Sequence, residues 1–303
     1  MIDAEKIYYY TDFNTFKLIL QNGTLRFKES TSSNDRLDTV QLYDNLLKMA
    51  EQKCAEKETD PAQKFFFDML RHNGSKSSRV SLVACFTSKA DSRLLWDAYT
   101  MHRKDRAANR YNGVCIEFDK EHLINAMNSV SGIFDVRRCH GIIYGFDRID
   151  QYLEKIMNIF SMEVDDLSKD ENQDQNIIAP IPVPMTRLEI KFKKCIVHPV
   201  LHLIDMFDSL APYFKHSFWR EECETRALLS IKVKSEKIQE LGEYSDGSKY
   251  YDLSISEQCI SKVILGPELS DSDVSDLQSV SGAISFCNLR TEPSEGTNVI
   301  TNR

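Results

Sequence analysis

Hydrophobic and polar residues follow two patterns along this 303-residue chain. Short runs of apolar, aromatic and β-branched residues predict strands, because such side chains are favoured in sheets. We expect strands over residues 7–11, 24–27, 80–87, 114–118, 139–144, 227–233, 250–253, 259–265 and 283–289. Apolar residues spaced by three and four predict helices. We expect these over 13–21, 39–72, 91–101, from 121 onward, 149–162 and 271–280, and over 188–195 and 200–210 as one bent or two successive helices.

Capping and turn residues set several of these boundaries. Asp12 and Asp119 each stand directly before a predicted helix, where an aspartate side chain can accept from the first free backbone N–H groups. Asn22-Gly23 is typical of a helix end. The range 177–184 holds three alternating prolines, which exclude a helix interior there.

Together the elements predict an α+β fold in one domain over residues 1–290. We expect a helical insertion at about 39–75 and a helical, proline-rich insertion at about 147–212. The range 291–303 is rich in Ser, Thr, Asn and Glu, and we expect it to be a disordered tail.

Composition indicates in which compartment the protein works and which classes of partner it is expected to bind. The chain has a net charge of −8 and a hydrophobic content of 42%, so broad binding to nucleic acid is not expected. Its eight cysteines show no CxxC spacing, which predicts free thiols in a cytoplasmic protein. No apolar run reaches the length of a membrane span, so we expect no membrane contact. Nothing in the sequence indicates an oligomeric state.

The range 214–230 combines ionisable residues with an apolar segment. If a strand begins at Glu222, the period of two puts Glu222, Glu224 and Arg226 on one face. Carboxylates two residues apart would then lie roughly 7 Å from each other. They could bind a common cation or sugar, with the arginine keeping one of them ionised. The same pattern is also typical of solvated charges at the end of a strand.

Other candidate motifs are weaker. The chain has no glycine-rich phosphate loop, no GxSxG and no HExxH. Cys195, His198 and His202 have a spacing found among metal ligands, but Pro199 bends the chain between them and no fourth ligand is evident. We therefore expect no metal site. The pair Trp96 and Tyr99 is typical of core packing or of a ligand platform.

In combination, these pieces resemble a widespread, largely uncharacterised bacterial domain family that is sometimes found near phage-defence genes. Its pattern is a Tyr-His-Tyr-Thr strand, a Phe…Asn-Asp-Pro-x-Glu loop, a Cys-Phe-Ser strand, a Met-Trp-x-x-Tyr helix, a Gly-Val-Cys-Ile-Glu-Phe strand and a Trp-x-x-Glu-x-Glu-x-Arg motif. The matching residues are Tyr8 to Thr11, Phe27 with 34–38, Cys85 to Thr87, Leu95 to Tyr99, Gly113 to Phe118, and Trp219 with Glu222, Glu224 and Arg226.

That family in turn looks like the ADP-ribosyltransferase fold, a split β-sandwich that binds NAD. The resemblance implies a transferase acting on a macromolecular acceptor, protein or nucleic acid, in antiviral defence or toxicity. It aligns Tyr9 and Thr11 with the first NAD-binding element, where Tyr9 replaces the usual histidine. The second element would be Phe86, Thr87 and Ser88.

The resemblance also implies the roles of the remaining site residues. Glu224 would stabilise the oxocarbenium ion that develops when the nicotinamide bond breaks. Glu222 would orient or deprotonate the acceptor. The ring of Tyr10, Trp96 or Tyr99 would stack on nicotinamide. Arg226 would pair with a carboxylate or a cofactor phosphate, so residues 222–226 form the third element of the site.

Two other functions fit the same residues. The first is a sensor module that binds a nucleotide without turnover. The second is an RNA-acting nuclease, in which the paired carboxylates of Glu222 and Glu224 would work with Arg226 and with Mg²⁺. The sequence leaves these alternatives open.

Overall fold

The computed structural model describes residues 5–32, 42, 44, 45, 48, 78–100, 113–145, 205, 208–267, 269–280 and 285–288. The chain divides into two compact units. Unit 1 comprises residues 1–33, 80–142 and 218–303, and unit 2 comprises 34–79 and 143–217. The two predicted insertions fall in the ranges of unit 2. Most of both insertions, and the predicted tail at 291–303, lie outside the described residues.

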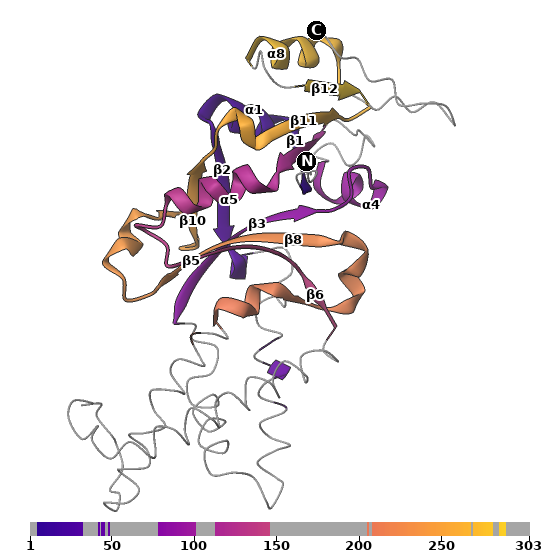
Figure 1. Cartoon of the computed structure of the whole chain (residues 1–303). Coiled ribbons are helices and arrows are strands. Elements are labelled where there is room, and N and C mark those ends of the chain that lie inside the picture. Colours follow the sequence, from indigo (N-terminus) through magenta and orange to yellow (C-terminus); the bar gives the residue numbers. More distant parts are fainter. Residues whose placement is uncertain are drawn as a thin grey trace, which may run out of the picture. The chain divides into compact units, whose positions relative to one another are not determined.

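Unit 1 is built on one sheet that branches at a single strand (Figure 1). Its strands are β1 (Lys6–Asp12), β2 (Thr24–Glu29), β3 (Arg79–Thr87), β4 (Gly113–Asp119), β5 (Val136–Gly141), β8 (Glu224–Lys232), β9 (Gly242–Glu243), β10 (Lys249–Ser254), β11 (Ile260–Leu265) and β12 (Ser285–Asn288). β3 pairs with β1, β2 and β8. One wing runs from β1 through β4 and β11 to β12, and the other from β2 through β10 to β9, while β8 continues to β5.

Most of these pairings are antiparallel, and the sheet curls. β1 pairs with β4 over its whole length, from Lys6 opposite Asp119 to Asp12 opposite Gly113. β11 and β12 run parallel to each other. The predicted α+β mixture is therefore confirmed. The strands predicted near residues 7, 82, 114 and 226 are β1, β3, β4 and β8, which neighbour one another in the sheet.

Helices cover both faces of this sheet. They are α1 (Phe13–Asn22), α4 (Arg93–Leu95), the π-helix η2 (Trp96–Thr100), α5 (Lys120–Ser129), α8 (Asp271–Val280), and the 3-10 helices η1 (Ser30–Ser32), η5 (Ser217–Glu222), η6 (Glu236–Glu240) and η7 (Glu257–Cys259). α5 contacts β4, β5 and β10, so it closes the inside of the curl (Figure 1). η2 contacts β1 and β4.

Strand periodicity divides the side chains between these two faces. The core face packs against α1 and α5 and includes Ile7, Tyr9, Val80, Leu82, Ala84, Phe86, Val114, Ile116, Phe118, Ala227, Leu229, Ile231, Val263 and Leu265. The second face packs against α4 and η2 and includes Tyr8, Tyr10, Cys115 and Ile264, with Leu95 and Trp96 from the helices. The large aromatic and aliphatic core accounts for most of the stabilisation of unit 1.

The predicted ends of α1 are confirmed. Asp12 is the N-cap, and its Oδ1 accepts from the Thr15 backbone nitrogen at 2.9 Å. Gly23 ends the helix at φ 59°, a left-handed conformation that favours glycine.

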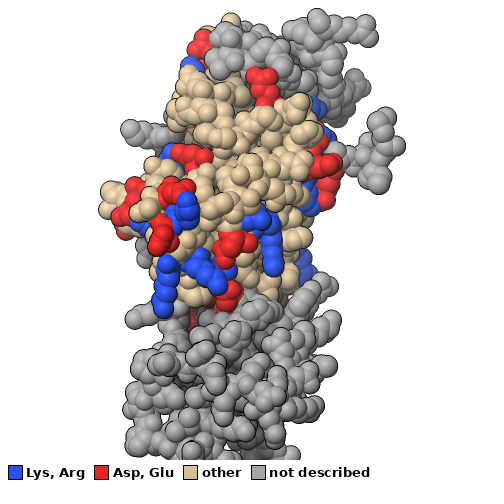
Figure 2. All heavy atoms as spheres, turned by 60° about the vertical axis from the view of Figure 1, so that its left-hand side comes forward, with Lys and Arg blue, Asp and Glu red and all other residues tan. Residues whose placement is uncertain are grey.

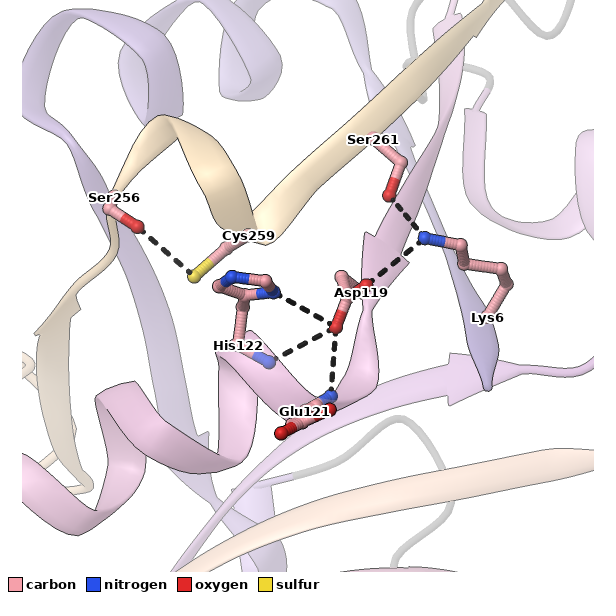
Figure 3. A network of polar contacts seen from close by, with 7 residues as sticks. All are labelled: Lys6, Asp119, Glu121, His122, Ser256, Cys259 and Ser261. Atoms are coloured by element: carbon pink, nitrogen blue, oxygen red, sulfur yellow. Dashed lines mark hydrogen bonds and ion pairs between the residues drawn. The ribbon is translucent and has the colours of Figure 1, made fainter. Parts of the chain in front are cut away.

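Asp119 caps α5 and also joins three elements (Figure 3). Its Oδ1 accepts from the backbone nitrogens of Glu121 and His122 at 3.0 and 3.1 Å. Lys6 lies 3.1 Å from its Oδ2 and donates to Ser261 Oγ at 2.8 Å. Burial alone would raise the pKa of Asp119, but the donors of His122 and Lys6 outweigh burial and lower this pKa to about 2.

Asp119→Ala should therefore lower the free energy of unfolding by about 1–2 kcal/mol at neutral pH, because the helix loses its cap. The folded-state pKa lies below the ordinary 3.8, so this carboxylate stabilises the fold above about pH 4 and loses its effect as the pH falls towards 2. Urea denaturation across this pH range should show a flatter acid dependence for Asp119→Ala than for wild type.

Asp12→Ala is the matched control, because Asp12 caps a second ten-residue helix, α1. Its carboxylate accepts hydrogen bonds from the backbone nitrogen and the hydroxyl of Thr15. We expect a similar loss of stability at neutral pH. An unchanged acid dependence in Asp119→Ala would contradict the assignment to Asp119.

In unit 2 the described elements are the 3-10 helix η4 (Ala211–Tyr213) and the parallel strands β6 (Ile143–Tyr144) and β7 (Phe214–Lys215). Asp208 is buried, and its Oδ2 accepts from the backbone nitrogen and the hydroxyl of Ser78, each at 2.5 Å. Burial raises the pKa of Asp208 to about 6, although the Ser78 bond opposes this shift. Arg79 binds Asp205 at 2.7 Å.

Two further sequence predictions can be compared with the described residues. Cys85, Cys115, Cys139, Cys223 and Cys259 are free thiols, as predicted. No helix in the described ranges is both long enough and apolar enough to cross a membrane.

Candidate functional site

The candidate site lies on the second face of the sheet, around the start of β8. Residues 224–231 of this strand are all buried. Ala227, Leu229 and Ile231 point into the core, so the period of two places Glu224 and Arg226 on the opposite face. A charged pair on a strand that is buried throughout requires a specific partner for each charge.

Glu224 and Arg226 are partners of each other. Arg226 Nε lies 2.6 Å from Glu224 Oε1, and Arg226 Nη2 lies 3.3 Å from Oε2. The side chains are only 6% and 3% exposed. Because both oxygens are engaged by one guanidinium in a poorly solvated setting, the pair is held in one geometry with both groups charged.

The prediction that Glu222 belongs to the same strand is wrong. Glu222 is the last residue of η5, and β8 begins only at Glu224. Between them Cys223 has φ 45°, the positive-φ non-glycine residue among those described. A left-handed residue breaks the period of two, so Glu222 and Glu224 leave the backbone in different directions.

Hydrogen bonds from the end of β3 hold this turn. Thr87 Oγ1 donates to the Glu222 carbonyl at 2.7 Å, and the Ser88 nitrogen donates to the Cys223 carbonyl at 3.2 Å. Lys89 Nζ donates to the Glu221 carbonyl at 2.7 Å. A left-handed cysteine costs on the order of 1–2 kcal/mol, and such strain persists where the surroundings over-determine it, most often at functional sites.

Tyr99 reaches the Glu222 carboxylate from the π-helix η2. Its hydroxyl donates to Glu222 Oε1 at 2.9 Å, and the tyrosine is 43% exposed. Burial of the hydroxyl, followed by the negative charges of Glu222 and Glu224, raises the pKa of Tyr99. The phenol is therefore a proton donor to the carboxylate, with its ring open to solvent.

Tyr10 and Trp96 form a buried pair of aromatic rings. Their ring centroids are 5.2 Å apart at 85°, an edge-to-face contact. The Tyr10 hydroxyl donates to the Lys89 carbonyl and accepts from the Ser92 nitrogen, both at 3.0 Å. Both rings are buried, so of the three predicted stacking residues Tyr99 is the one with an accessible face.

The structure separates the other predicted cofactor-binding residues between the two faces. Tyr9 and Phe86 are on the core face, with ring centroids 5.6 Å apart, and burial raises the pKa of Tyr9 to about 12. Thr11 lies two residues after Tyr9 on β1, so it faces the same side of the sheet, and it is buried. Thr87 and Ser88 lie beside the Cys223 turn. Tyr9, Phe86 and Thr11 are thus separated by the sheet from Glu224.

Cys85 and Lys89 also belong to this neighbourhood, although the sequence indicated Cys85 only as part of the family pattern and Lys89 not at all. Cys85 is exposed, while every other residue of β3 is buried, so the second face is open at this position. It interacts electrostatically with Tyr99. A continuous apolar run predicts burial on both faces, and no sequence signal distinguishes Cys85 from its neighbours.

The arrangement offers carboxylate chemistry. Two buried carboxylates flank a strained turn, one bonded to a phenol and the other to a guanidinium. Such groups stabilise a developing cation, accept a proton or bind sugar hydroxyls. Within the described ranges no group of three or more His, Cys, Asp or Glu side chains is placed to hold a metal ion.

Comparison with known proteins places part of this site in a family. No curated protein and no solved structure matches the chain. Residues 95–227 match a family described as "Protein of unknown function (DUF2971)". The matched range includes η2, β4, β5, η5 and the start of β8. The expected resemblance to an uncharacterised domain family is therefore confirmed over this range: a DUF2971 domain is found at residues 95–227.

Proposed function

We propose that unit 1 transfers an ADP-ribosyl group from NAD to a macromolecular acceptor, at a site centred on Glu222 and Glu224. The observation that carries the proposal is the pair of buried carboxylates on either side of the strained Cys223, each with its own fixed partner. Stored strain together with two differently partnered carboxylates is typical of an active site rather than of a packing feature.

The proposed reaction assigns a different task to each carboxylate. The bond between nicotinamide and ribose breaks with its electron pair leaving on nicotinamide, and the ribose carbon becomes cationic. Glu224, held ionised by Arg226, stabilises this cation electrostatically. The acceptor then attacks the same carbon and gives its proton to Glu222. Nicotinamide, the ADP-ribosylated acceptor and one proton are the products.

The exposure and the position of Tyr99 support it as the contact for the nicotinamide ring. Its ring is exposed, and its hydroxyl is within hydrogen-bond distance of Glu222. Arg226 is nearly inaccessible and binds Glu224 through two nitrogens, so in this proposal it pairs with the carboxylate and not with a phosphate. The branching of the sheet at β3 supports a split β-sandwich of ADP-ribosyltransferase type.

One observation favours a sensor that binds nucleotide without turnover. Arg226 already compensates the charge of Glu224 at 2.6 Å, which weakens the field that Glu224 can exert on a developing cation. The nuclease alternative gains less support. On the face shown in Figure 2, basic and acidic side chains lie beside each other, which does not favour a polyanion there.

Incubation of the full chain with NAD labelled in the adenylate and nicotinamide portions tests the proposal. Release of nicotinamide with transfer of the adenylate label to an acceptor is the expected result. Saturable binding without release would identify a sensor. Cleavage of RNA that depends on added Mg²⁺, with no effect on NAD, would support a nuclease instead.

A further inference from the structure

Tyr99 is held in place by its own helix, independently of Glu222. At one end of η2, Trp96 packs edge-to-face on Tyr10. At the other end Thr100 is fully buried, and its Oγ1 donates to the Trp96 carbonyl at 2.7 Å. Any side chain at Gly113 would overlap Thr100, so the helix also abuts the start of β4. These anchors fix the π-helical turn that carries Tyr99.

Glu222 has its backbone fixed by different residues. Thr87 binds its carbonyl, and Cys223 turns the chain directly after it. A glutamate side chain retains three rotatable bonds beyond this fixed backbone. The hydroxyl of Tyr99, at 2.9 Å from Oε1, is a contact that restricts the carboxylate on this fixed backbone.

We propose that Tyr99 is the positioning residue of Glu222: its hydroxyl orients the carboxylate towards the bound acceptor for proton transfer. This inference rests on the proposed function and adds a residue to its second step. A π-helical turn within a helix is itself frequent at functional sites. Among the described residues, the ionisable groups near Tyr99 include Glu224, which Arg226 binds, and the exposed thiol of Cys85.

The physical consequence concerns orientation. Without the hydroxyl, the Glu222 carboxylate would lose one fixed contact and would sample more rotamers. A residue that served only to stabilise the fold would not change the ratio of transfer to nicotinamide release.

Tyr99→Phe is the direct test, because it removes the hydroxyl and keeps the ring. We expect transfer to the acceptor to fall about 10–100-fold, the effect of one hydrogen bond to a charged group, while nicotinamide release changes little. Tyr8→Phe is the control: it removes a hydroxyl bonded to Glu117, a carboxylate outside the site, and should leave both activities unchanged.

A second measurement does not depend on activity. Urea denaturation of wild type, Tyr99→Phe, Glu222→Gln and the double variant gives the coupling between the two side chains. Clear coupling at neutral pH supports the inference, and its absence overturns it, as does an unchanged ratio of transfer to nicotinamide release in Tyr99→Phe. Clear coupling in a protein that never releases nicotinamide would reject the proposed function while leaving the Tyr99–Glu222 interaction supported.

Discussion

Glu224→Gln should lower the rate of nicotinamide release by about 10²–10³-fold, with a much smaller change in NAD affinity. The substitution keeps the shape of the side chain and removes its negative charge. One preorganised electrostatic partner contributes about 2.7–4 kcal/mol to the stabilisation of a transition state. Release should be measured on protein that is fully folded at the assay temperature, because Glu224 is also half of a buried ion pair.

Two variants separate this role from general effects of charge. Glu117→Gln removes a carboxylate from β4, a strand that β1 and β3 separate from β8, and should leave release unchanged. Glu222→Gln should spare release and impair transfer, because its proposed role belongs to the second step. If Glu224→Gln releases nicotinamide as fast as wild type, Glu224 is not the electrostatic partner of the reaction.

Arg226→Met should have the largest effect on stability, lowering the free energy of unfolding by about 3–5 kcal/mol. The methionine fills much of the same space, but Glu224 is left buried without its guanidinium. Removing one member of a buried ion pair is costly, because the remaining charge has lost its partner and does not regain water. Urea denaturation at neutral pH measures the loss.

The double variant Glu224→Met/Arg226→Met is the matched control. Replacing both members of such a pair by apolar side chains is often close to neutral, so we expect most of the lost stability to return. The double variant should remain inactive towards NAD even though it is well folded. A small cost for Arg226→Met alone would show that the pair is better solvated than its 3% and 6% exposures indicate.

Local sequence signals predicted most of the elements of unit 1. Asp12 and Asp119 both cap the helices that they were expected to cap, and α8 occupies the predicted residues 271–280. These features depend on neighbouring residues, through capping bonds and through the periodicity of apolar side chains. The shared face of Glu224 and Arg226 follows from the strand period alone.

The parts that were missed depend on contacts between distant segments. The left-handed Cys223 is held by Thr87 and Ser88, more than a hundred positions earlier in the chain, so the local pattern still favoured a strand through Glu222. The face of Tyr9 was likewise undetermined, because three consecutive tyrosines give no sign of which side is the core. The Tyr99–Glu222 contact also joins distant segments.

The burial of β8 along residues 224–231, with β3 and β5 as its neighbours, has a consequence for motion in the site. Backbone amides in such a strand exchange with solvent only when the sheet around them opens cooperatively. Glu224 and Arg226 thus belong to the slowest-opening part of the unit, whereas Tyr99 approaches from a short helix on its surface. Any adjustment to a bound ligand therefore falls to the exposed side chain of Tyr99, and the strand acts as a fixed reference.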